Sequence, residues 1–200
     1  MAISLLSIIF DILLINKKDY YITIFYEFFI IIIFAITLSI NAFSQTCRSN
    51  IPTTTAVERF IVNEDGTVLD TETNLVWKRC AEGQVFDSTA TTCNLDHISY
   101  DWQQGLAAAM QSSFAGKSDW RLPNVKELDS IVARHCVSPA IELIPFPNTP
   151  SVLFLSSTPY SRATGPELVM YVDFANGSLN HGLKSSQKYA VRLVRSNSGE

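Results

Sequence analysis

The stretch DWRLPNVKEL, from Asp119 to Leu128, marks the point where the chain passes from a strand into a helix. Pro123 has no backbone N–H and pushes the residue before it towards an extended conformation, so the chain arrives here as strand or loop. Asn124 can then cap a helix, and Glu127, three residues later, can complete a capping box. We therefore predict a strand-to-helix corner, followed by one buried helical stripe that contains Val125, Leu128, Ile131 and Val132.

Short segments of alternating polarity lie on both sides of this corner. They predict strands at residues 59–62, 67–70, 75–78, 152–155, 168–174 and 188–195. Capping signals predict helices near residues 101–114 and 124–134. Strands followed by helices and then by strands are typical of an α+β fold. We expect both helices to pack on a mainly antiparallel sheet over one core, which contains Trp77, Trp102, Trp120, Leu122 and Leu128.

The first 44 residues carry the pattern of an export signal. Residues 20–40 form a nearly unbroken apolar run after Lys17 and Lys18, and Ala42 and Ser44 place small side chains where a signal peptidase reads. We expect a signal peptide at residues 1–44. The alternative is a retained N-terminal membrane anchor, because about 20 apolar residues suffice to span a bilayer. Residues 45–58 then form a lead-in, residues 59–196 one domain and residues 197–200 a tail, in the periplasm, at the cell surface or secreted.

Composition limits the partners of this domain. The chain of 200 residues is 17% charged and has a formal net charge of −4 at pH 7. It has no basic excess of the kind that a nucleic-acid surface needs, so we expect no nucleic-acid partner. Contact with a membrane is expected only through an uncleaved N-terminal segment.

All four cysteines follow the predicted cleavage site, at positions 47, 80, 93 and 136. An even number of cysteines in an exported chain predicts disulfides, and three pairings are formally possible. Cys80 and Cys93 enclose a polar loop with little means of ordering itself, and closing it should contribute about 3 kcal/mol. That leaves Cys47 and Cys136 as the second pair. A zinc site is the alternative, but the sequence has no pair of cysteines with the close spacing that zinc sites typically use.

Asn63, Glu64, Asp65 and Asp70 form a polar cluster that is mostly acidic. A calcium loop would need spaced oxygen ligands and a closing bidentate glutamate, which this segment lacks. An Asp-Gly hairpin turn at residues 63–66 accounts for the same residues. We therefore expect no metal and no cofactor.

Motifs along the chain resemble one known family. They are DGTVxD (65–70), TxLVW (73–77), WxxxL (102–106), DWRLPNxxEL (119–128), FPNTP (146–150), VDFxxG (172–177) and VRLVR (191–195). Their order resembles the bacterial domain family named for the C-terminal domain of the Legionella collagen-like protein, over about residues 59–195. The resemblance implies an exported envelope or surface domain, and in the namesake the domain binds sulfated glycosaminoglycans and supports adhesion. The corner at residues 121–127 is also similar to one in formylglycine-generating enzymes, which implies a C-type-lectin-like scaffold. The two disulfides predicted from the cysteines would stabilise it.

Two classes of function compete, a binding module and an enzyme. The candidates for catalysis are His97, His135 and His181, which are scattered and show no nucleophile–base spacing. His135 stands beside Cys136, but a disulfide would use that sulfur. The active cysteines of formylglycine-generating enzymes are not matched at any motif position. We therefore expect a binding domain without catalytic residues, with a periplasmic enzyme of unknown reaction as the alternative.

The C-terminal third is locally basic in an acidic protein. Residues 162–195 contain five lysines and arginines against two acidic residues. We predict that Arg162, Lys184 and Lys188 converge on one face and contact an anionic glycan or another cell-surface partner. The alternative needs no ligand: Lys184 and Lys188 would only keep a surface loop soluble.

Overall fold

The computed structural model describes residues 45–162 and 164–197. These residues belong to one compact unit, Ser44–Glu200. The leader predicted for residues 1–44 and most of the predicted tail lie outside the described residues. Within the described ranges, no helix combines the length and the apolar character that crossing a bilayer requires.

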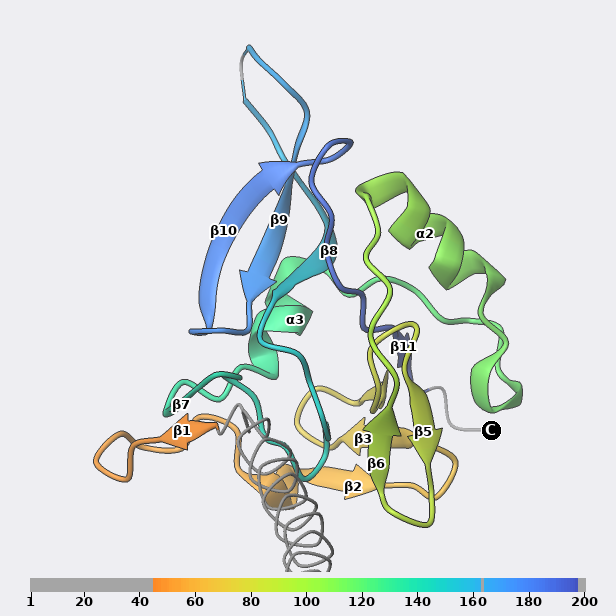
Figure 1. The fold of residues 1–200 in the computed structure, drawn as a ribbon, viewed down its shortest axis with the longest axis vertical. Helices are drawn as coiled ribbons and strands as arrows, with labels where there is room; N and C mark the ends of the chain where they lie inside the picture. Colours follow the sequence, from red (N-terminus) through yellow and green to blue (C-terminus); the bar gives the residue numbers. More distant parts are fainter. Residues whose placement is uncertain (1–44, 163, 198–200) are drawn as a thin grey trace, which may run out of the picture. The chain divides into compact units, whose positions relative to one another are not determined.

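In the described part of the chain, antiparallel strands in four sheets supply most of the regular structure (Figure 1). The largest sheet has the order β11–β4–β3–β2 and consists of β2 (Phe60–Val62), β3 (Thr67–Asp70), β4 (Leu75–Lys78) and β11 (Val194–Ser196). A second sheet has the order β10–β9–β8 and consists of β8 (Leu153–Tyr160), β9 (Leu168–Asp173) and β10 (Ser178–Leu183). Two small sheets pair β1 (Thr46–Cys47) with β7 (Cys136–Val137), and β5 (Val85–Asp87) with β6 (Thr92–Asn94).

The described residues contain two α-helices, and both are short. They are α2 (Trp102–Gln111) and α3 (Val125–Ser130), and 3-10 turns occur at η1 (Val57–Arg59) and η2 (Phe114–Gly116). Both predicted capping boxes are confirmed: Asp101 with Gln104 begins α2, and Asn124 with Glu127 begins α3.

The predicted fold class was wrong. The described residues form mostly β-sheet, with two helices of 10 and 6 residues, and their architecture shows no C-type-lectin-like fold. The helix predicted for residues 124–134 ends early because its second half pairs elsewhere. Val132 forms a bridge with Ile141, and the Ala133 N–H donates to the Ala140 carbonyl at 3.1 Å.

The strand-to-helix corner does form, and tertiary contacts fix it. Trp120 is buried, and its indole N–H donates to the Phe114 carbonyl at 2.9 Å. The backbone of Arg121 pairs with Val194, the first residue of β11, while its guanidinium binds both carboxylate oxygens of Glu127 at 2.8 Å. The corner thus joins the edge of the largest sheet to α3.

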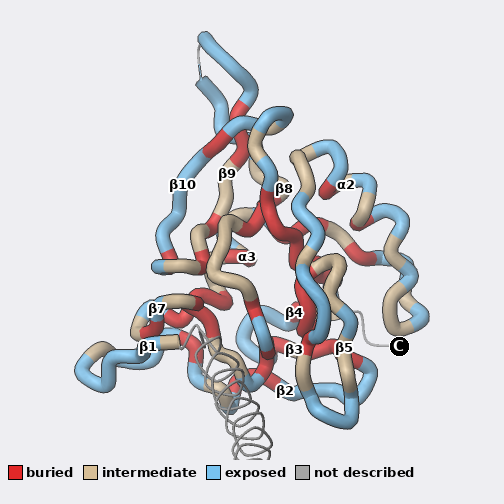
Figure 2. Tube along the Cα trace, in the orientation of Figure 1, coloured by how far each residue is buried: buried red, intermediate tan, exposed pale blue. Residues whose placement is uncertain are grey.

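Buried side chains form two clusters instead of the single core that we predicted. Trp77 and Leu128 belong to the first cluster, and Trp120 and Leu122 to the second. Trp102 is only partly buried and packs against the second cluster. Figure 2 shows the buried stretches gathered along β3, β4 and β8.

Both predicted disulfides are confirmed, Cys47–Cys136 and Cys80–Cys93. Cys47 and Cys136 are direct partners in the β1–β7 register. The polar loop between Cys80 and Cys93 contains order that the sequence did not predict. It folds into the β5–β6 hairpin, in which Phe86 is the register partner of Cys93.

Candidate functional site

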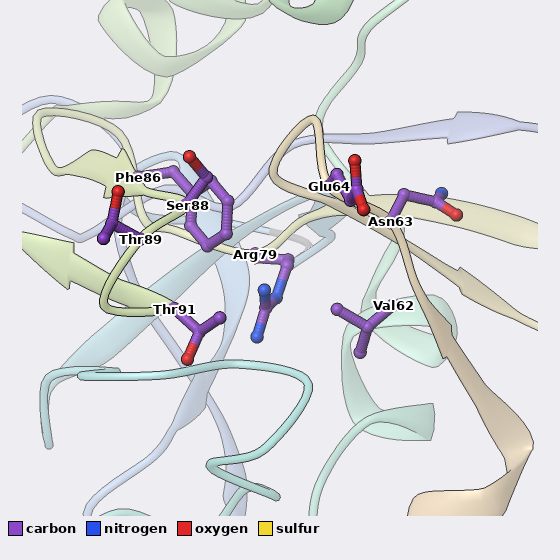
Figure 3. Close-up of a pocket in the computed structure, with 8 residues that line it drawn as sticks. All are labelled: Val62, Asn63, Glu64, Arg79, Phe86, Ser88, Thr89 and Thr91. Atoms are coloured by element: carbon purple, nitrogen blue, oxygen red, sulfur yellow. The ribbon is translucent and has the colours of Figure 1, made fainter.

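A pocket of about 510 Å³ opens between the β2–β3 turn and the β5–β6 hairpin. We call it the Arg79 pocket. Figure 3 shows its lining, with one group of side chains from the hairpin and its turn, another from the end of β2 and the following turn, and Arg79 between them. The lining residues are Val62, Asn63, Glu64, Arg79, Phe86, Ser88, Thr89 and Thr91.

The β2–β3 turn approaches the hairpin closely because its glycine has no side chain. Gly66 has φ +82°, and a Cβ atom at this position would lie 2.9 Å from Cδ1 of Phe86. The Asp65 carboxylate stabilises the turn by accepting hydrogen bonds from the N–H and the hydroxyl of Thr67 at 2.9 and 2.7 Å. The Gly66 carbonyl in turn accepts the Arg79 N–H at 3.0 Å, so the turn also positions Arg79.

Arg79 is a buried cation without a carboxylate partner among the described residues. Its Nε donates to the Pro145 carbonyl at 3.0 Å and its Nη2 to the Ile144 carbonyl at 2.8 Å. Its Cζ lies 4.8 Å from the ring centroid of Phe86. Burial lowers the pKa of Arg79 below its ordinary value. Nη1 makes no hydrogen bond within the described part of the chain, and Figure 3 shows the guanidinium between Thr91 and Val62.

Residues with hydroxyl groups line the hairpin side of the pocket. Ser88, Thr89 and Thr91 are exposed and belong to the turn between β5 and β6. Hydroxyls can donate hydrogen bonds to an oxyanion, and a guanidinium donates the stronger charge-assisted ones. The Glu64 carboxylate also lines the pocket and would repel an anion there, but its exposure to water weakens this repulsion. The arrangement can therefore hold a carboxylate, sulfate or phosphate group.

The structure brings two of the three predicted ligand residues together, at the first turn of α2. Nζ of Lys184 lies 3.3 Å from the Glu167 carboxylate and 4.1 Å from the ring centroid of Trp102. Nζ of Lys188 lies 3.0 Å from the Asp101 carboxylate. Both lysines are thus already paired with acidic residues, beside a smaller pocket of about 260 Å³.

The third predicted ligand residue, Arg162, takes no part in these ion pairs. It is exposed on the loop between β8 and β9, and no described contact joins it to Lys184 or Lys188. The predicted contact of these three residues with an anionic saccharide stays a prediction.

The three histidines lie in separate parts of the fold. His97 lines a pocket after β6, and the ring of His181 lies 4.2 Å from that of Tyr160. The third histidine, His135, lies close to a pair of cysteines: its ring and the sulfur atoms of Cys47 and Cys136 are within 4.8 Å of one another. The two sulfur atoms form a disulfide, so they are not the thiolates that bind metal ions.

The imidazole of His135 also lies near a partly buried carboxylate, that of Glu142. Nε2 of His135 lies 3.6 Å from the Glu142 carboxylate, and burial raises the pKa of Glu142. This pairing gives His135 a structural partner next to the disulfide.

The family model of the Lcl C-terminal domain matches residues 66–195, from the β2–β3 turn to β11. The chain belongs to this family. No curated protein and no solved structure matches this chain. The matched part of this Lcl C-terminal domain contains Arg79 and the whole β5–β6 hairpin, whereas Val62, Asn63 and Glu64 of the pocket precede it.

Sequence reasoning missed Arg79 as a site residue. The only local signal is a basic side chain directly before a cysteine, after the strand-forming residues of β4. Its carbonyl partners, Ile144 and Pro145, follow 65 and 66 residues later, in a proline-rich segment without periodicity. In the Lcl C-terminal domain the pocket is therefore a product of tertiary structure.

Proposed function

We propose that this Lcl C-terminal domain is an exported binding domain that recognises an anionic saccharide, and that the Arg79 pocket holds the carboxylate or sulfate group. The observation that carries the proposal is the buried Arg79 guanidinium, which has carbonyl partners and an open pocket but no carboxylate partner among the described residues.

A buried cation normally has an anionic partner, because burial removes the water that would otherwise stabilise its charge. Carbonyl oxygens compensate the charge of Arg79 only in part, and Nη1 remains available. An oxyanion in the pocket would accept a charge-assisted hydrogen bond from Nη1, which contributes roughly 1.5–3 kcal/mol. The hydroxyls of Ser88 and Thr89 can add neutral hydrogen bonds, whereas the Thr91 hydroxyl donates to the Ala90 carbonyl at 2.8 Å.

Export is supported by two lines of reasoning. Two disulfides form and persist in oxidising compartments, and the domain has no free cysteine among its described residues. The predicted signal peptide or anchor at residues 1–44 would bring the chain to such a compartment.

The Arg79 pocket supports anion binding better than the surface around Lys184 and Lys188. A ligand at either lysine would have to displace Glu167 or Asp101 from an existing ion pair. At Arg79 a ligand would displace no carboxylate of the described residues.

The test compares binding of the purified full chain to dextran sulfate, polygalacturonate and uncharged dextran. Ser88→Asp places a carboxylate at an exposed position in the pocket, where it should compete for Arg79. We expect it to weaken binding of an anionic polymer by about tenfold or more, since roughly 1.5–3 kcal/mol is at stake. Ser49→Asp makes the same charge change at an exposed residue outside the pocket and should bind like the parent.

Glu64→Gln should strengthen binding, because it removes the negative charge from the pocket lining. Binding should also weaken as salt screens the interaction. Equal binding by Ser88→Asp and Ser49→Asp, or no binding of either anionic polymer, would contradict the proposal. If a triple alanine variant of Arg162, Lys184 and Lys188 alone loses binding, the site is the originally predicted surface.

A further inference from the structure

Among the described residues, one group of side chains of the types that bind metal ions gathers around the Cys47–Cys136 disulfide. Ligand atoms of Cys47, His135 and Cys136 lie within 4.8 Å of one another. A zinc ion lies about 2.3 Å from a thiolate sulfur and about 2.0–2.1 Å from an imidazole nitrogen, so two ligand atoms of one ion are at most roughly 4.6 Å apart. The three side chains therefore need only small movements to share an ion, once the sulfur atoms are thiolates.

The imidazole of His135 has one nitrogen free for a metal ion. Nδ1 is buried and makes no hydrogen bond within the described part of the chain, whereas Nε2 lies 3.6 Å from the Glu142 carboxylate. Leaving a buried polar atom without a partner costs free energy. In metal sites, the ring nitrogen that does not bind the ion usually donates to a carboxylate, carbonyl or water, which orients the ring. His135 and Glu142 are close to this arrangement, and it leaves Nδ1 for the ion.

The strands that carry the two cysteines, β1 and β7, lie side by side (Figure 1), and hydrogen bonds hold them independently of the disulfide. The Arg48 N–H donates to the His135 carbonyl at 2.8 Å. The side-chain amide of Gln45 donates to the carbonyls of Pro139 and Ile141 at 2.7 and 2.6 Å. In a relaxed chain these hydrogen bonds would keep the two sulfur atoms close to the imidazole after the disulfide has been reduced.

A reductant can reach this disulfide more easily than the other one. Cys47 is exposed, and Cys136 is buried. In the second disulfide both Cys80 and Cys93 are buried. Thiol–disulfide exchange depends on access to a sulfur atom, so reduction should begin at Cys47. The same exposure would let water occupy a fourth position on a bound ion.

We propose that Cys47, Cys136 and His135 bind a zinc ion when a dithiol reductant opens the Cys47–Cys136 disulfide. The dithiol gives up two electrons and two protons and becomes a disulfide, and the two cysteines become thiols. Zinc then displaces both thiol protons, because the thiolate is the form that binds the metal. Two thiolates, one imidazole and a water molecule complete a four-coordinate site with an open position.

The zinc ion and the disulfide exclude each other. Zinc would join β1 to β7 in the reduced chain as the disulfide does in the oxidised chain, and it would keep both sulfur atoms from reoxidising until it leaves. The site does not depend on the Arg79 pocket. Cys47 also precedes residue 66, where the match to the family model begins, so the cluster is a property of this chain.

The test measures zinc binding by the purified full chain before and after reduction with a phosphine in anoxic buffer. We expect the reduced chain to bind one zinc ion and the oxidised chain to bind none. Zinc should also raise the Tm of the reduced chain, because the ion binds the folded form. Cobalt(II) in place of zinc should give the charge-transfer absorption of thiolate ligands in the reduced chain.

Two matched pairs of variants locate the ion. His135→Gln should weaken zinc binding by about tenfold or more, since even the loss of a second-shell partner of a ligand costs about 10–100-fold. His97→Gln removes a histidine that lines a separate pocket and should bind like the parent. In the reduced chain, Cys47→Ser should abolish the thiolate–cobalt absorption, whereas Cys80→Ser, in the other cysteine pair, should keep it.

Each outcome decides for or against this site. Absence of zinc binding by the reduced parent, or equal binding before and after reduction, would overturn the proposal. Equal zinc affinities of His135→Gln and His97→Gln would overturn it as well, and this comparison remains decisive even if reduction loosens the fold. Loss of the cobalt absorption in Cys80→Ser but not in Cys47→Ser would assign the ion to the other pair of cysteines.

Discussion

A buried ion pair at the start of the β2–β3 hairpin should be one of the main determinants of the stability of this domain. Asp70 is fully buried and accepts hydrogen bonds from Nε and Nη2 of Arg59 at 2.8 and 2.5 Å. It also accepts from the Thr73 hydroxyl at 2.6 Å. The same guanidinium reaches a second carboxylate, Glu72, at 3.0 Å, but the Glu72 side chain is 65% exposed. One cation thus has a buried and an exposed partner, which can be removed separately.

Asp70→Asn keeps the size of the side chain and removes its charge. Arg59 would then remain nearly buried without a buried counter-charge, which costs about 3–5 kcal/mol in the free energy of unfolding. Glu72→Gln removes the exposed partner and should cost at most about 1 kcal/mol. Urea unfolding at pH 7, followed by tryptophan fluorescence, measures both values. With an m-value of about 1–3 kcal/mol/M, Asp70→Asn should lower the midpoint by roughly 1 M or more.

Equal midpoint shifts for the two variants would refute this reasoning, because burial would then not distinguish the two carboxylates. A loss below about 1 kcal/mol for Asp70→Asn would also refute it. The result matters for the site, since the turn of this hairpin forms one wall of the Arg79 pocket.

Two further predictions concern the strand-to-helix corner. Trp120→Ala should lower the free energy of unfolding by about 3–5 kcal/mol, because Trp120 is 4% exposed and belongs to the second core cluster, and chemical denaturation measures the loss. Glu127 should make stability depend on pH. Burial acts to raise the pKa of Glu127, but hydrogen bonds from Arg121 and the helix cap lower it below its ordinary value of 4.5. The stabilisation is therefore present above about pH 4.5 and is lost as the pH falls through the lowered pKa. The difference in stability between the parent and Glu127→Gln should be larger at pH 7 than at pH 3.

The parts of the fold that depend on local chemistry could be predicted from the sequence. Both helix starts follow from a capping residue and its partner three positions later, Asp101 with Gln104 and Asn124 with Glu127. The disulfide pairing followed from loop composition and the even number of cysteines. Helix ends were less predictable, because α3 gives way to a strand-like pairing of Val132 that depends on residues further along the chain.

The candidate site could not be predicted, because its contacts join segments far apart in sequence. The β5–β6 hairpin has polar residues without a clear alternation, and a disulfide and the Asn148 amide hold it. The basic residues of the C-terminal third were correctly identified as a charge excess, but their partners were not. Asp101 lies 87 residues before Lys188, and no local pattern joins the two.

The disulfide between Cys47 and Cys136 has a mechanical consequence. It joins the beginning of the described chain to β7 and bypasses the 89 positions that separate the two cysteines in sequence. Tension applied to the chain before Thr46 would pass through the covalent bond into β7. The segment between the two cysteines, which includes β2 to β6 and both helices, would lie outside the path of that force. The two hairpins that border the Arg79 pocket, β2–β3 and β5–β6, would then keep their shape while the chain is pulled, whereas a chain with reduced cysteines would begin to unravel from β1.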